Sequence, residues 1–563
     1  MTQHTLSSLG LGMAGLLLAV AAQADDTHAL RVSCESLTSF QVAASKIALP
    51  SGAASIDSAQ LQAAAPLTVA ERYGTPSGAI NPATPEFCKV VGHIAPLDAK
   101  APNIVFEVNL PMQWNGRSVQ YGGGGFNGTL ITGLGLLPAA RLDDAAPVAL
   151  GYVTMGTDSG HQNKPNEAIQ AFALNDEAFE NFTHAAYKKL HDVAAALVQH
   201  AYGRSTDFAY YFGSSEGGRE ALTMAQRYPK DYQGIFARVP VINWTGLIHS
   251  SFRSGLATQG EAWLDRPQVE LVHQAVLKTC DELDGLKDQL VANPVACRAK
   301  FDVTQLQCPA GATPQEQACL SAAQVKAVQT LHSAYRFEGF DMANGINDYP
   351  GWGVSGEAAA PMGPTGGWRS WFVGTRAPSV PAHPENGIVW FFGSGAMQYV
   401  FARDPNLDVR QYRPANYKAR IEQVSQLMDS TNPNLKAFQD AGGKLIVLEN
   451  MADYAQSPYA GIRYFEAVQK TLGKEQVAKF AKLYTAPGVD HVGAGAPEYF
   501  KVLQVLSAWT EKDQAPQNLQ VVDQDPKAPF TPKRSLPLCE WPTWPKYLGT
   551  GDVTAASSFV CSQ

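Results

Sequence analysis

Two kinds of segment alternate along the chain from about residue 103. Short apolar runs such as IVFEVNLP, SVQYGGGG, VALGYVTMGTD and FAYYF have the composition of buried strands, and a long stretch over residues 176–201 has the spacing of an amphipathic helix. Strands that alternate with such helices are typical of a mostly parallel sheet covered by helices. The pattern therefore predicts an α/β fold.

The alternation stops after YQGIFARVPVINW, which ends at Trp244, and resumes after about residue 410. The segment between is rich in Gly, Pro and Trp, as in DYPGWGVSGEAAAPMGPTGGWRSWF, and has no sustained helical or strand period. Its aromatic content is too high for a solvated linker. We therefore predict a core in two parts, residues 25–245 and 411–563, with an inserted lid domain over 246–410.

The second part of the core repeats the strand and helix pattern. KLIVLENMAD, residues 444–453, reads as a buried strand, and SPYAGIRYFEAVQKTLG reads as a helix. FAKLYTAPGVDH then reads as a strand with a loop, and APEYFKVLQVLSAWTEK as an amphipathic helix. Two further strands are thus expected, each followed by a loop.

Composition narrows the possible partners. The 563 residues are 45% hydrophobic and carry a formal net charge of −8, with Lys and Arg scattered along the chain. A nucleic-acid binder would show a clustered basic footprint, so we expect no nucleic-acid partner. A small organic substrate fits this composition better, and the oligomeric state is not indicated.

The N-terminal residues resemble an export signal. An apolar stretch over residues 9–22 ends in Ala22-Gln23-Ala24, which matches a small-residue cleavage site, although no Lys or Arg precedes it. The alternative is a membrane anchor, but the stretch is shorter than the roughly 20 residues of a spanning helix. We predict removal of residues 1–24, export to the periplasm or the medium, and no membrane contact afterwards.

The cysteine count agrees with export. There are eight cysteines and no C-x-x-C pair, which favours disulfides over metal thiolates. Spacing suggests three local pairs and leaves one longer pair, although spacing alone does not fix the connectivity. The suggested pairs are Cys280 with Cys297, Cys308 with Cys319, Cys539 with Cys561, and Cys34 with Cys88.

The octapeptide GSSEGGRE, from Gly213 to Glu220, carries the first sign of chemistry. It lies between the strand-like FAYYF and the helix-like ALTMAQRYP. Gly-x-Ser-x-Gly in this context predicts a nucleophile elbow, in which glycines let the backbone turn sharply and expose the hydroxyl of Ser215.

A serine hydroxyl needs a base, and the base needs an orienting acid. In elbow hydrolases the acid and then the histidine follow the serine, on loops after later strands. Asp453 and His491 fit that order. Glu449 and Asp490 compete for the acid role, Asp453 is alternatively a helix cap before Ser457, and His491 is alternatively a surface-loop histidine.

An oxyanion hole requires backbone donors beside the serine. The N–H of Glu216 supplies one, and the loop YGGGGFNGT offers a second, for which we choose Gly125. The same loop matches the dinucleotide-binding pattern at Gly123, Gly125 and Gly128, with Asp143 about twenty residues later. Against that alternative, Gly and Pro interrupt the segment where the phosphate-facing helix would run.

The segment CDELDGLKDQL places three carboxylates in one short loop, at Asp281, Asp284 and Asp288. Calcium is held by several carboxylates and backbone carbonyls, here those of Leu286 and Leu290. This is not the EF-hand pattern, so spacing alone favours an exposed acidic turn beside Cys280.

Several motifs in a fixed order resemble the tannase and feruloyl esterase family. They are WNGR, GGGGFNG, TDSGHQN, GSSEGGRE, CDELDGLKD, GWRSW, APGVDH and the terminal cysteine segment, which together span nearly the whole mature chain. The resemblance implies an α/β-hydrolase fold with a large inserted lid domain. It also implies Ser215, Asp453 and His491 as the triad, with Gly125 and Glu216 as the oxyanion donors.

The resemblance raises the calcium interpretation above the acidic turn. It implies a structural ion in the lid and no organic cofactor, with the ion held by Asp281, Asp284, Leu286, Asp288 and Leu290.

The chain also departs from the family at the site. The family usually has cysteines before the serine and after the histidine, joined as a disulfide, whereas this chain has Ser214 and Val492. The resemblance therefore implies a variant without that active-site disulfide. In family members that cleave terephthalate monoesters, a lid arginine is expected to bind the free carboxylate of the substrate. Ile388 aligns with that arginine here, so a carboxylate clamp in this chain would need Arg376 or Arg403.

Three lid aromatics, Trp371, Phe392 and Phe401, match positions that sandwich an aromatic ring. We therefore expect an exported serine esterase whose partner is a small-molecule aromatic ester, of the feruloyl, galloyl or terephthalate monoester type. The alternative function is a non-catalytic binding protein on the same fold.

Overall fold

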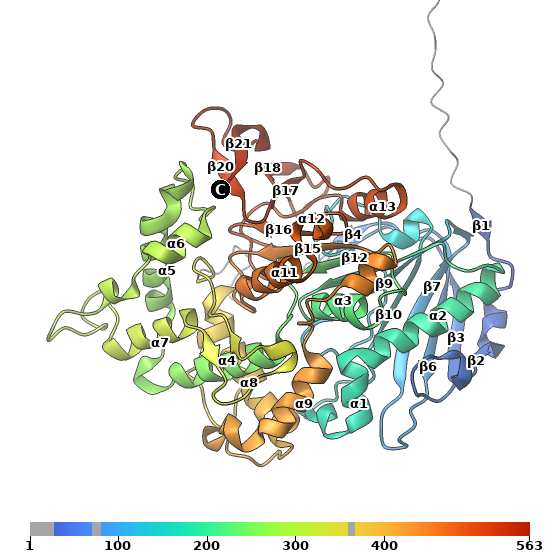
Figure 1. Ribbon diagram of the computed structural model, residues 1–563, viewed down its shortest axis with the longest axis horizontal. Coiled ribbons are helices and arrows are strands. Elements are labelled where there is room, and N and C mark those ends of the chain that lie inside the picture. The colour runs from blue at the N-terminus through green and yellow to red at the C-terminus, as the bar shows by residue number, and fades with distance from the viewer. Residues whose placement is uncertain (1–26, 70–79, 358–365) are drawn as a thin grey trace, which may run out of the picture.

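An eleven-stranded mixed sheet forms the centre of the protein (Figure 1). The computed structural model describes residues 27–69, 80–357 and 366–563, so the predicted export signal lies outside the described residues. In spatial order the strands are β19 (Cys539–Glu540), β16 (Ala481–Ala486), β15 (Lys444–Asn450), β12 (Gly234–Arg238), β11 (Phe208–Ser214), β9 (Arg117–Tyr121), β10 (Val153–Thr157), β7 (Ile104–Pro111), β6 (Phe87–Ile94), β3 (Ala54–Gln62) and β2 (Gln41–Val42).

Six neighbouring strands of this sheet run parallel. From β10 through β9, β11, β12 and β15 to β16, every neighbouring pair is parallel, as the α/β prediction requires. Because the carboxyl ends of parallel strands meet at one edge, the loops that follow β9, β11, β15 and β16 gather there.

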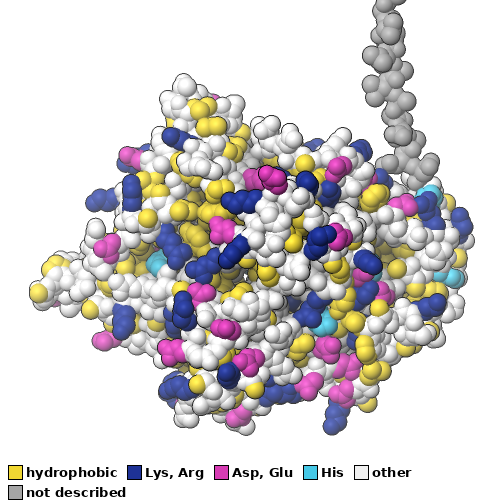
Figure 2. Space-filling view, viewed as in Figure 1, with side chains coloured by type: hydrophobic (Ala, Val, Ile, Leu, Met, Phe, Trp, Pro, Cys, Tyr) yellow, Lys and Arg dark blue, Asp and Glu magenta, His cyan; other side chains and the backbone are white. Residues whose placement is uncertain are grey.

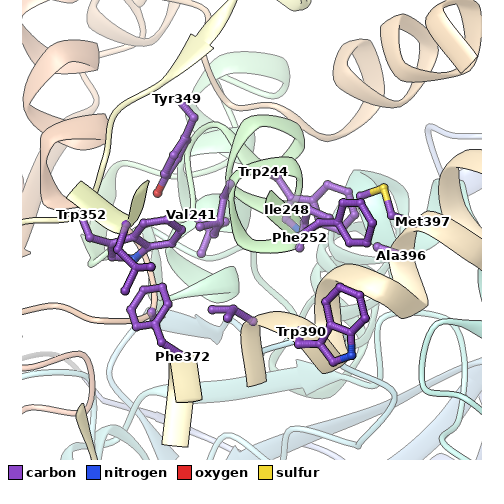
Figure 3. Packing of buried hydrophobic residues seen from close by; sticks show 14 of the residues in the cluster. Val241, Trp244, Ile248, Phe252, Tyr349, Trp352, Phe372, Trp390, Ala396 and Met397 are labelled. Atoms are coloured by element: carbon purple, nitrogen blue, oxygen red, sulfur yellow. The ribbon is translucent and has the colours of Figure 1, made fainter. Parts of the chain in front are cut away.

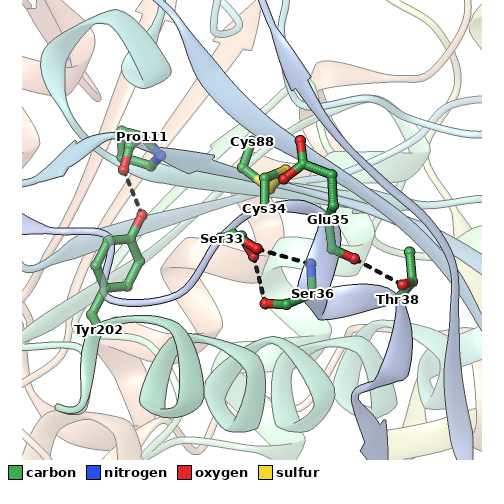
Figure 4. The surroundings of a disulfide bond; sticks show 8 residues. All are labelled: Ser33, Cys34, Glu35, Ser36, Thr38, Cys88, Pro111 and Tyr202. Carbon is green, nitrogen blue, oxygen red and sulfur yellow. Dashed lines mark hydrogen bonds between the residues drawn. A yellow bond between two sulfur atoms is a disulfide. The ribbon is translucent and has the colours of Figure 1, made fainter.

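The strands beyond β10 pair antiparallel, and of these only β7, the run IVFEVNLP, was predicted as a strand. β7, β6, β3 and β2 pair in that order, and β7 joins the parallel strands through β10. The Cys34–Cys88 disulfide ties the short helix Glu35–Ser39 to β6, and the Tyr202 hydroxyl donates to the carbonyl of Pro111 nearby (Figure 4). The polar residues interspersed along β3 gave only a weak strand signal.

Helices cover both faces of the parallel strands. In β11, Tyr210 and Phe212 face a cluster that includes α13, while Tyr211 between them faces a cluster that includes α3 and α11. This period of two places successive side chains on opposite faces. The helices of the core are α1 (Asp176–Glu180), α2 (Ala186–Tyr202), α3 (Glu216–Arg227), α11 (Pro458–Leu472), α12 (Lys474–Val477) and α13 (Val502–Lys512). α10 (Lys436–Asp440), near the end of the segment between β12 and β15, packs on the same core through Phe438.

The predicted last helix starts later than its sequence suggests. APEYFKVLQVLSAWTEK predicts a helix from residue 496, but α13 begins at Val502. The N–H of Tyr499 donates to the carbonyl of Val522 at 3.0 Å, and that of Phe500 to Ala139 at 2.9 Å. These distant partners hold the backbone of Tyr499 and Phe500 outside the helix. The helical spacing of apolar residues in the sequence carries no information about such partners.

Residues 239–443, between β12 and β15, form what we call the insertion, which contributes no strand to the large sheet among the residues described. Its ends lie together, because the N–H of Ser430 donates to the carbonyl of Ile242 at 2.9 Å. The predicted lid, residues 246–410, falls inside this stretch, and Figure 1 shows the larger helices of the insertion beside the sheet. They are α4 (Trp244–Ala257), α5 (Arg266–Cys280), α6 (Pro294–Lys300), α7 (Ala322–His332), α8 (Ile388–Ala396) and α9 (Lys418–Met428).

The insertion is more helical than its sequence pattern indicated. Its core is rich in aromatic side chains, with Trp244, Phe252, Trp352, Phe372 and Trp390 packed together (Figure 3). α8 has the sequence IVWFFGSGA and α4 buries polar as well as apolar residues, so neither shows a narrow apolar stripe. A helix enclosed on most sides loses the 3.6-residue period.

Charges of both signs are interspersed over the visible face of the molecule, as Figure 2 shows. Within the described part of the chain, no helix is both long enough and apolar enough to cross a membrane. The structure has four disulfides, Cys34–Cys88, Cys280–Cys297, Cys308–Cys319 and Cys539–Cys561, the same pairs that the spacing suggests.

We expect the disulfide with the longest loop to stabilise the fold most. Cys34 and Cys88 are 54 residues apart, whereas Cys308 and Cys319 are 11 apart. Loop-closure entropy then gives about 4 kcal/mol for the first pair and about 3 kcal/mol for the second. Replacing each pair by alanines and measuring the free energy of unfolding in urea tests this, and an equal or larger loss for the shorter loop would contradict it.

Candidate active site

Ser215 lies in a sharp turn between β11 and α3. Its φ and ψ are +61° and −121°, a conformation that L-residues rarely adopt. A Cβ added to Gly213 would lie 1.9 Å from the carbonyl oxygen of Gly217, and one added to Gly217 would lie 2.7 Å from that of Gly123. Only glycine fits these positions, so the turn has the geometry of a nucleophile elbow.

A serine, a histidine and an aspartate lie in one hydrogen-bonded row. The Nε2 of His491 lies 2.9 Å from the Oγ of Ser215, and its Nδ1 lies 2.7 Å from the Oδ2 of Asp453. Asp453 follows β15 and His491 follows β16, so the carboxyl edge of the sheet brings them to the elbow. The other oxygen of Asp453 accepts the N–H groups of Ala455 and Gln456 at 2.7 and 3.0 Å.

The two competing carboxyls are occupied elsewhere. Burial raises the pKa of Glu449 well above its ordinary value, and its Oε2 accepts from the side chain of Gln456 at 2.8 Å. Burial also raises the pKa of Asp490 to about 6, and its Oδ1 accepts the N–H groups of Val492 and Ala494. Asp453 is the carboxyl in contact with the ring of His491.

The glycine loop, residues 122–128, packs on the first turn of α3. The N–H of Gly217 donates to the carbonyl of Gly123 at 3.1 Å, and the N–H of Gly123 donates to Oε2 of Glu220 at 3.0 Å. Gly125 has a φ of +60° in the turn closed by the N–H of Asn127 and the carbonyl of Gly124. The loop is thereby held against the helix that Ser215 precedes.

The dinucleotide-binding alternative fails on the local fold. The pattern at Gly123, Gly125 and Gly128 must open a helix whose N-terminus faces the phosphates. Residues 129–146 instead form turns and irregular backbone up to the short 3₁₀ helix Pro147–Leu150. Gly and Pro in this segment prevent a helix, as its sequence indicated.

The side chain of Glu216 is buried and forms an ion pair with Arg219, whose Nε lies 2.6 Å from Oε1. Burial raises the pKa of Glu216 to about 7 although Arg219 opposes the shift. Since the side chain is engaged in this pair, the group that Glu216 can offer a ligand is its backbone N–H, at the start of α3 where the first N–H groups lack intrahelical acceptors.

The three predicted aromatic contacts lie in two different places. The ring of Trp371 is 5.8 Å from that of His491 and 6.1 Å from that of Phe392. A Cβ on Gly125 would lie 3.9 Å from the Cζ of Phe392. Phe401, by contrast, is 1% exposed, and its ring lies 4.4 Å from that of His249 in the core of the insertion.

The predicted carboxylate-clamp positions have different surroundings. Ile388 is the first residue of α8, Arg376 is exposed, and Arg403 forms an ion pair with Asp176 while donating to the carbonyl of Leu174 at 2.6 Å. Arg403 is therefore already engaged on another element.

The acidic loop caps its own backbone. Oδ1 of Asp281 accepts the N–H groups of Asp288 and Gln289, and Oδ1 of Asp284 accepts that of Leu286. Oδ2 of Asp284 is buried without a hydrogen-bond partner, and burial raises the pKa of Asp284 to about 6. Arg534 forms an ion pair with Asp288, and no group of three metal-binding side chains gathers in the described residues.

Sequence reasoning missed the buried charges that hold the site together. Glu220 accepts from Gly123, from the hydroxyl of Tyr211 and, at 2.6 Å, from the side chain of Asn127. Arg238 at the end of β12 contacts the segments of both Ser214 and His491. Glu220 is part of the octapeptide, so that motif could have identified it. No residue near Arg238 in the sequence FARVP indicates its role.

Comparison with known proteins identifies the family. Residues 88–562 match the family described as "Tannase and feruloyl esterase". An uncharacterized esterase of Agrobacterium fabrum is 35% identical over 552 residues, covering 94% of this chain and 93% of that protein. The mono(2-hydroxyethyl) terephthalate hydrolase of Piscinibacter sakaiensis is 31% identical over 543 residues, covering 87% of each.

A solved structure shows the same fold. Feruloyl esterase B from Aspergillus oryzae superposes with a TM-score of 0.74 at 23% identity, covering 94% of this chain and 100% of the other. This likeness confirms the predicted α/β-hydrolase fold. Since the family match spans most of the chain, it also sets aside the alternative of a non-catalytic binding protein. The chain belongs to the tannase and feruloyl esterase family and is a carboxylic ester hydrolase.

Proposed function

We propose that this protein is an exported serine esterase that cleaves esters of aromatic carboxylic acids through an acyl-enzyme. The observation that carries the proposal is the row of contacts from Ser215 through His491 to Asp453, at 2.9 and 2.7 Å. A nucleophile within reach of a base that is itself oriented by a carboxylate is the arrangement that activates a serine hydroxyl.

In the proposed mechanism the Oγ of Ser215 attacks the ester carbonyl while Nε2 of His491 takes its proton. The imidazolium returns that proton to the departing alkoxide, which leaves as the alcohol and gives the acyl-enzyme. Water then attacks the acyl carbonyl with His491 as the base, releasing the acid and restoring the serine. Asp453 keeps Nε2 turned toward the serine throughout.

We assign the stabilisation of the negative charge on each tetrahedral intermediate to two backbone donors, the N–H groups of Glu216 and Gly125. Support comes from the position of Glu216 at the start of α3 and from the contact between the glycine loop and that helix. Donors fixed before the reaction need no reorganisation when the charge develops.

The acyl group is assigned to the space beside Trp371 and Phe392. Their rings lie edge to face, and the ring of Trp371 also lies edge to face with that of His491, an arrangement that suits contact with another ring. The names of the relatives, a terephthalate monoester hydrolase and a feruloyl esterase, agree with an aromatic acid. With Ile388 at the clamp position and Arg403 engaged, only Arg376 of the three positions is left to hold a terephthalate carboxylate, whereas a feruloyl-type or galloyl-type acid needs no such clamp.

Export to the periplasm or the medium is supported by the four disulfides, which persist in oxidising compartments. The apolar segment that ends at Ala24 is the proposed signal. We also propose that the chain is a family variant without an active-site disulfide, because Ser214 and Val492 flank the nucleophile and the base, and all eight cysteines pair elsewhere.

We further propose a structural calcium ion in the acidic loop. The donors are oxygens of the type calcium prefers, and the buried, unpartnered Oδ2 of Asp284 is a ligand atom in need of a cation. The proposed ligands are Asp281, Asp284, Asp288 and the carbonyls of Leu286 and Leu290. Binding requires Arg534 to leave Asp288, and the ion would stabilise the loop rather than act on substrate.

The serine mechanism predicts the effect of Ser215→Ala. Because the variant has no nucleophile, we expect kcat on a feruloyl ester to fall by at least about 10³-fold without loss of thermal stability. Stopped-flow measurement of alcohol release should show a burst of one equivalent in the parent protein and none in the variant. Equal turnover by both proteins would refute the mechanism.

The aromatic acyl site predicts a change in selectivity for Trp371→Ala. Loss of one ring contact should lower kcat/KM for methyl ferulate about tenfold more than kcat/KM for methyl butanoate. Phe401→Leu is the matched control, since Phe401 is packed inside the insertion. We expect that variant to lower the melting temperature and to keep the ratio of the two kcat/KM values, and a changed ratio would place Phe401 at the substrate.

The calcium proposal predicts that a chelator lowers the melting temperature. A ligand that binds only the folded state at about 100 times its Kd stabilises that state by about 2.7 kcal/mol. Adding calcium back should restore the melting temperature of the parent protein and leave Asp284→Asn unchanged. Identical melting curves with and without chelator would contradict the proposal.

A further inference from the structure

Arg238 is a buried arginine beside the elbow that the mechanism above does not use. It is the last residue of β12, directly opposite Ser214 in the parallel register with β11, and is 5% exposed. Its own carbonyl accepts the N–H of Ser215 at 3.0 Å. Backbone and side chain of one residue therefore meet the turn that holds the serine.

The guanidinium of Arg238 joins the two loops that carry the serine and the histidine. Its Nη1 donates to Oγ of Ser214 at 2.7 Å and to the carbonyl oxygen of His491 at 2.9 Å. Ser214 directly precedes the nucleophile, and the carbonyl belongs to the proposed base. One nitrogen thus connects both sides of the Ser215–His491 contact.

A second nitrogen of the guanidinium, Nε, is bonded to Glu498, while Nη2 is buried without a hydrogen-bond partner among the described residues. Nε donates to Oε1 of Glu498, which also accepts from the side-chain amide of Asn450 at 2.8 Å. Asn450 ends β15, and its amide also donates to the carbonyl of Asp490 at 2.7 Å. The network therefore includes the ends of β11, β12 and β15 and both residues of the Asp490–His491 segment.

The backbone after His491 packs closely against the ion pair of Arg238 and Glu498. Gly493 has a φ of +90°, and a Cβ on it would lie 2.3 Å from Oε2 of Glu498 and 3.1 Å from Nη2 of Arg238. The loop is consequently packed against both charged side chains. A shift of the pair would move the loop that carries the histidine.

We propose that Arg238 is a positioning residue that sets the separation of Ser215 and His491 by holding Ser214 and the His491 carbonyl on one guanidinium nitrogen. The inference rests on the triad proposed above. Arginine suits the task because its planar group offers several donors in fixed directions, so it bonds Glu498 on one side and the two loops on the other. A lysine ammonium offers a single nitrogen for the same acceptors.

The test compares Arg238→Lys with Arg117→Lys. Lysine keeps a cation beside Glu498, which avoids the cost of a buried unpaired carboxylate. Arg117 is the matched control, since it pairs with Glu511 at 2.8 and 2.7 Å at the opposite end of the parallel strands. Melting temperature, kcat and KM on a feruloyl ester, and the rate of serine labelling by a fluorophosphonate are measured for both.

We expect Arg238→Lys to lower kcat and the labelling rate together by about 10-fold to 100-fold, the penalty of a misplaced catalytic group. KM should change by no more than about twofold, because the substrate contacts remain. Arg117→Lys should lose stability to a similar degree and keep both rates. Ser214→Ala, which removes one of the two acceptors on Nη1, should show a smaller loss of the same kind.

The outcomes separate this inference from the proposed function. If Ser215→Ala is inactive but Arg238→Lys keeps its kcat and labelling rate, the positioning role is refuted and the serine mechanism stands. If kcat falls in proportion to melting temperature in both lysine variants, Arg238 is only a structural residue. If Ser215→Ala retains turnover, the triad itself is wrong.

Discussion

Contact between backbone segments at three glycines is the constraint on which the site depends. A side chain at Gly213 would overlap the carbonyl of Gly217, and one at Gly217 would overlap that of Gly123. With hydrogen at these positions, the end of β11, the start of α3 and the glycine loop lie against one another, and Ser215 is held between them at positive φ. The serine and the amides proposed for the oxyanion are therefore parts of one packed unit.

The sequence predicted the parts of the core whose signals are local. FAYYF followed by GSSEGG contains a strand, a turn and the start of a helix within a dozen residues, and Asp453 and His491 each follow an apolar run. Parallel order then brings those strand ends to one edge of the sheet. Arg238 escaped prediction because its role depends on which strand lies beside β11. That neighbour is decided by the packing of the whole sheet rather than by residues near the motif.

The insertion shows a different reason for failure. Two of its helices, α4 and α8, are buried on most sides, so their sequences lack the alternation of apolar and polar faces that reveals a surface helix. The same enclosure limits what can be inferred about substrate contacts from aromatic residues alone. Phe392 and Phe401 lie nine residues apart, yet one faces the glycine loop and the other is buried beside His249. Residue type predicted a ring in both places, and only the course of α8 and of the π-helical segment Met397–Ala402 that continues it separates the two environments.

Buried carboxyls near the elbow differ in their partners, and this difference selects the one that acts on the histidine. Glu216 faces Arg219, and Glu449 has its pKa raised well above the ordinary value by burial and bonds a side-chain amide. Asp453 uses one oxygen for two backbone N–H groups, and its other oxygen lies 2.7 Å from Nδ1 of His491 and accepts from the side-chain amide of Gln456 at 3.3 Å. Its carboxylate cannot rotate without losing both N–H bonds, so the ring it holds is also fixed. A ring fixed in this way keeps Nε2 directed at Ser215 before substrate arrives, which is what the proposed mechanism requires of the base.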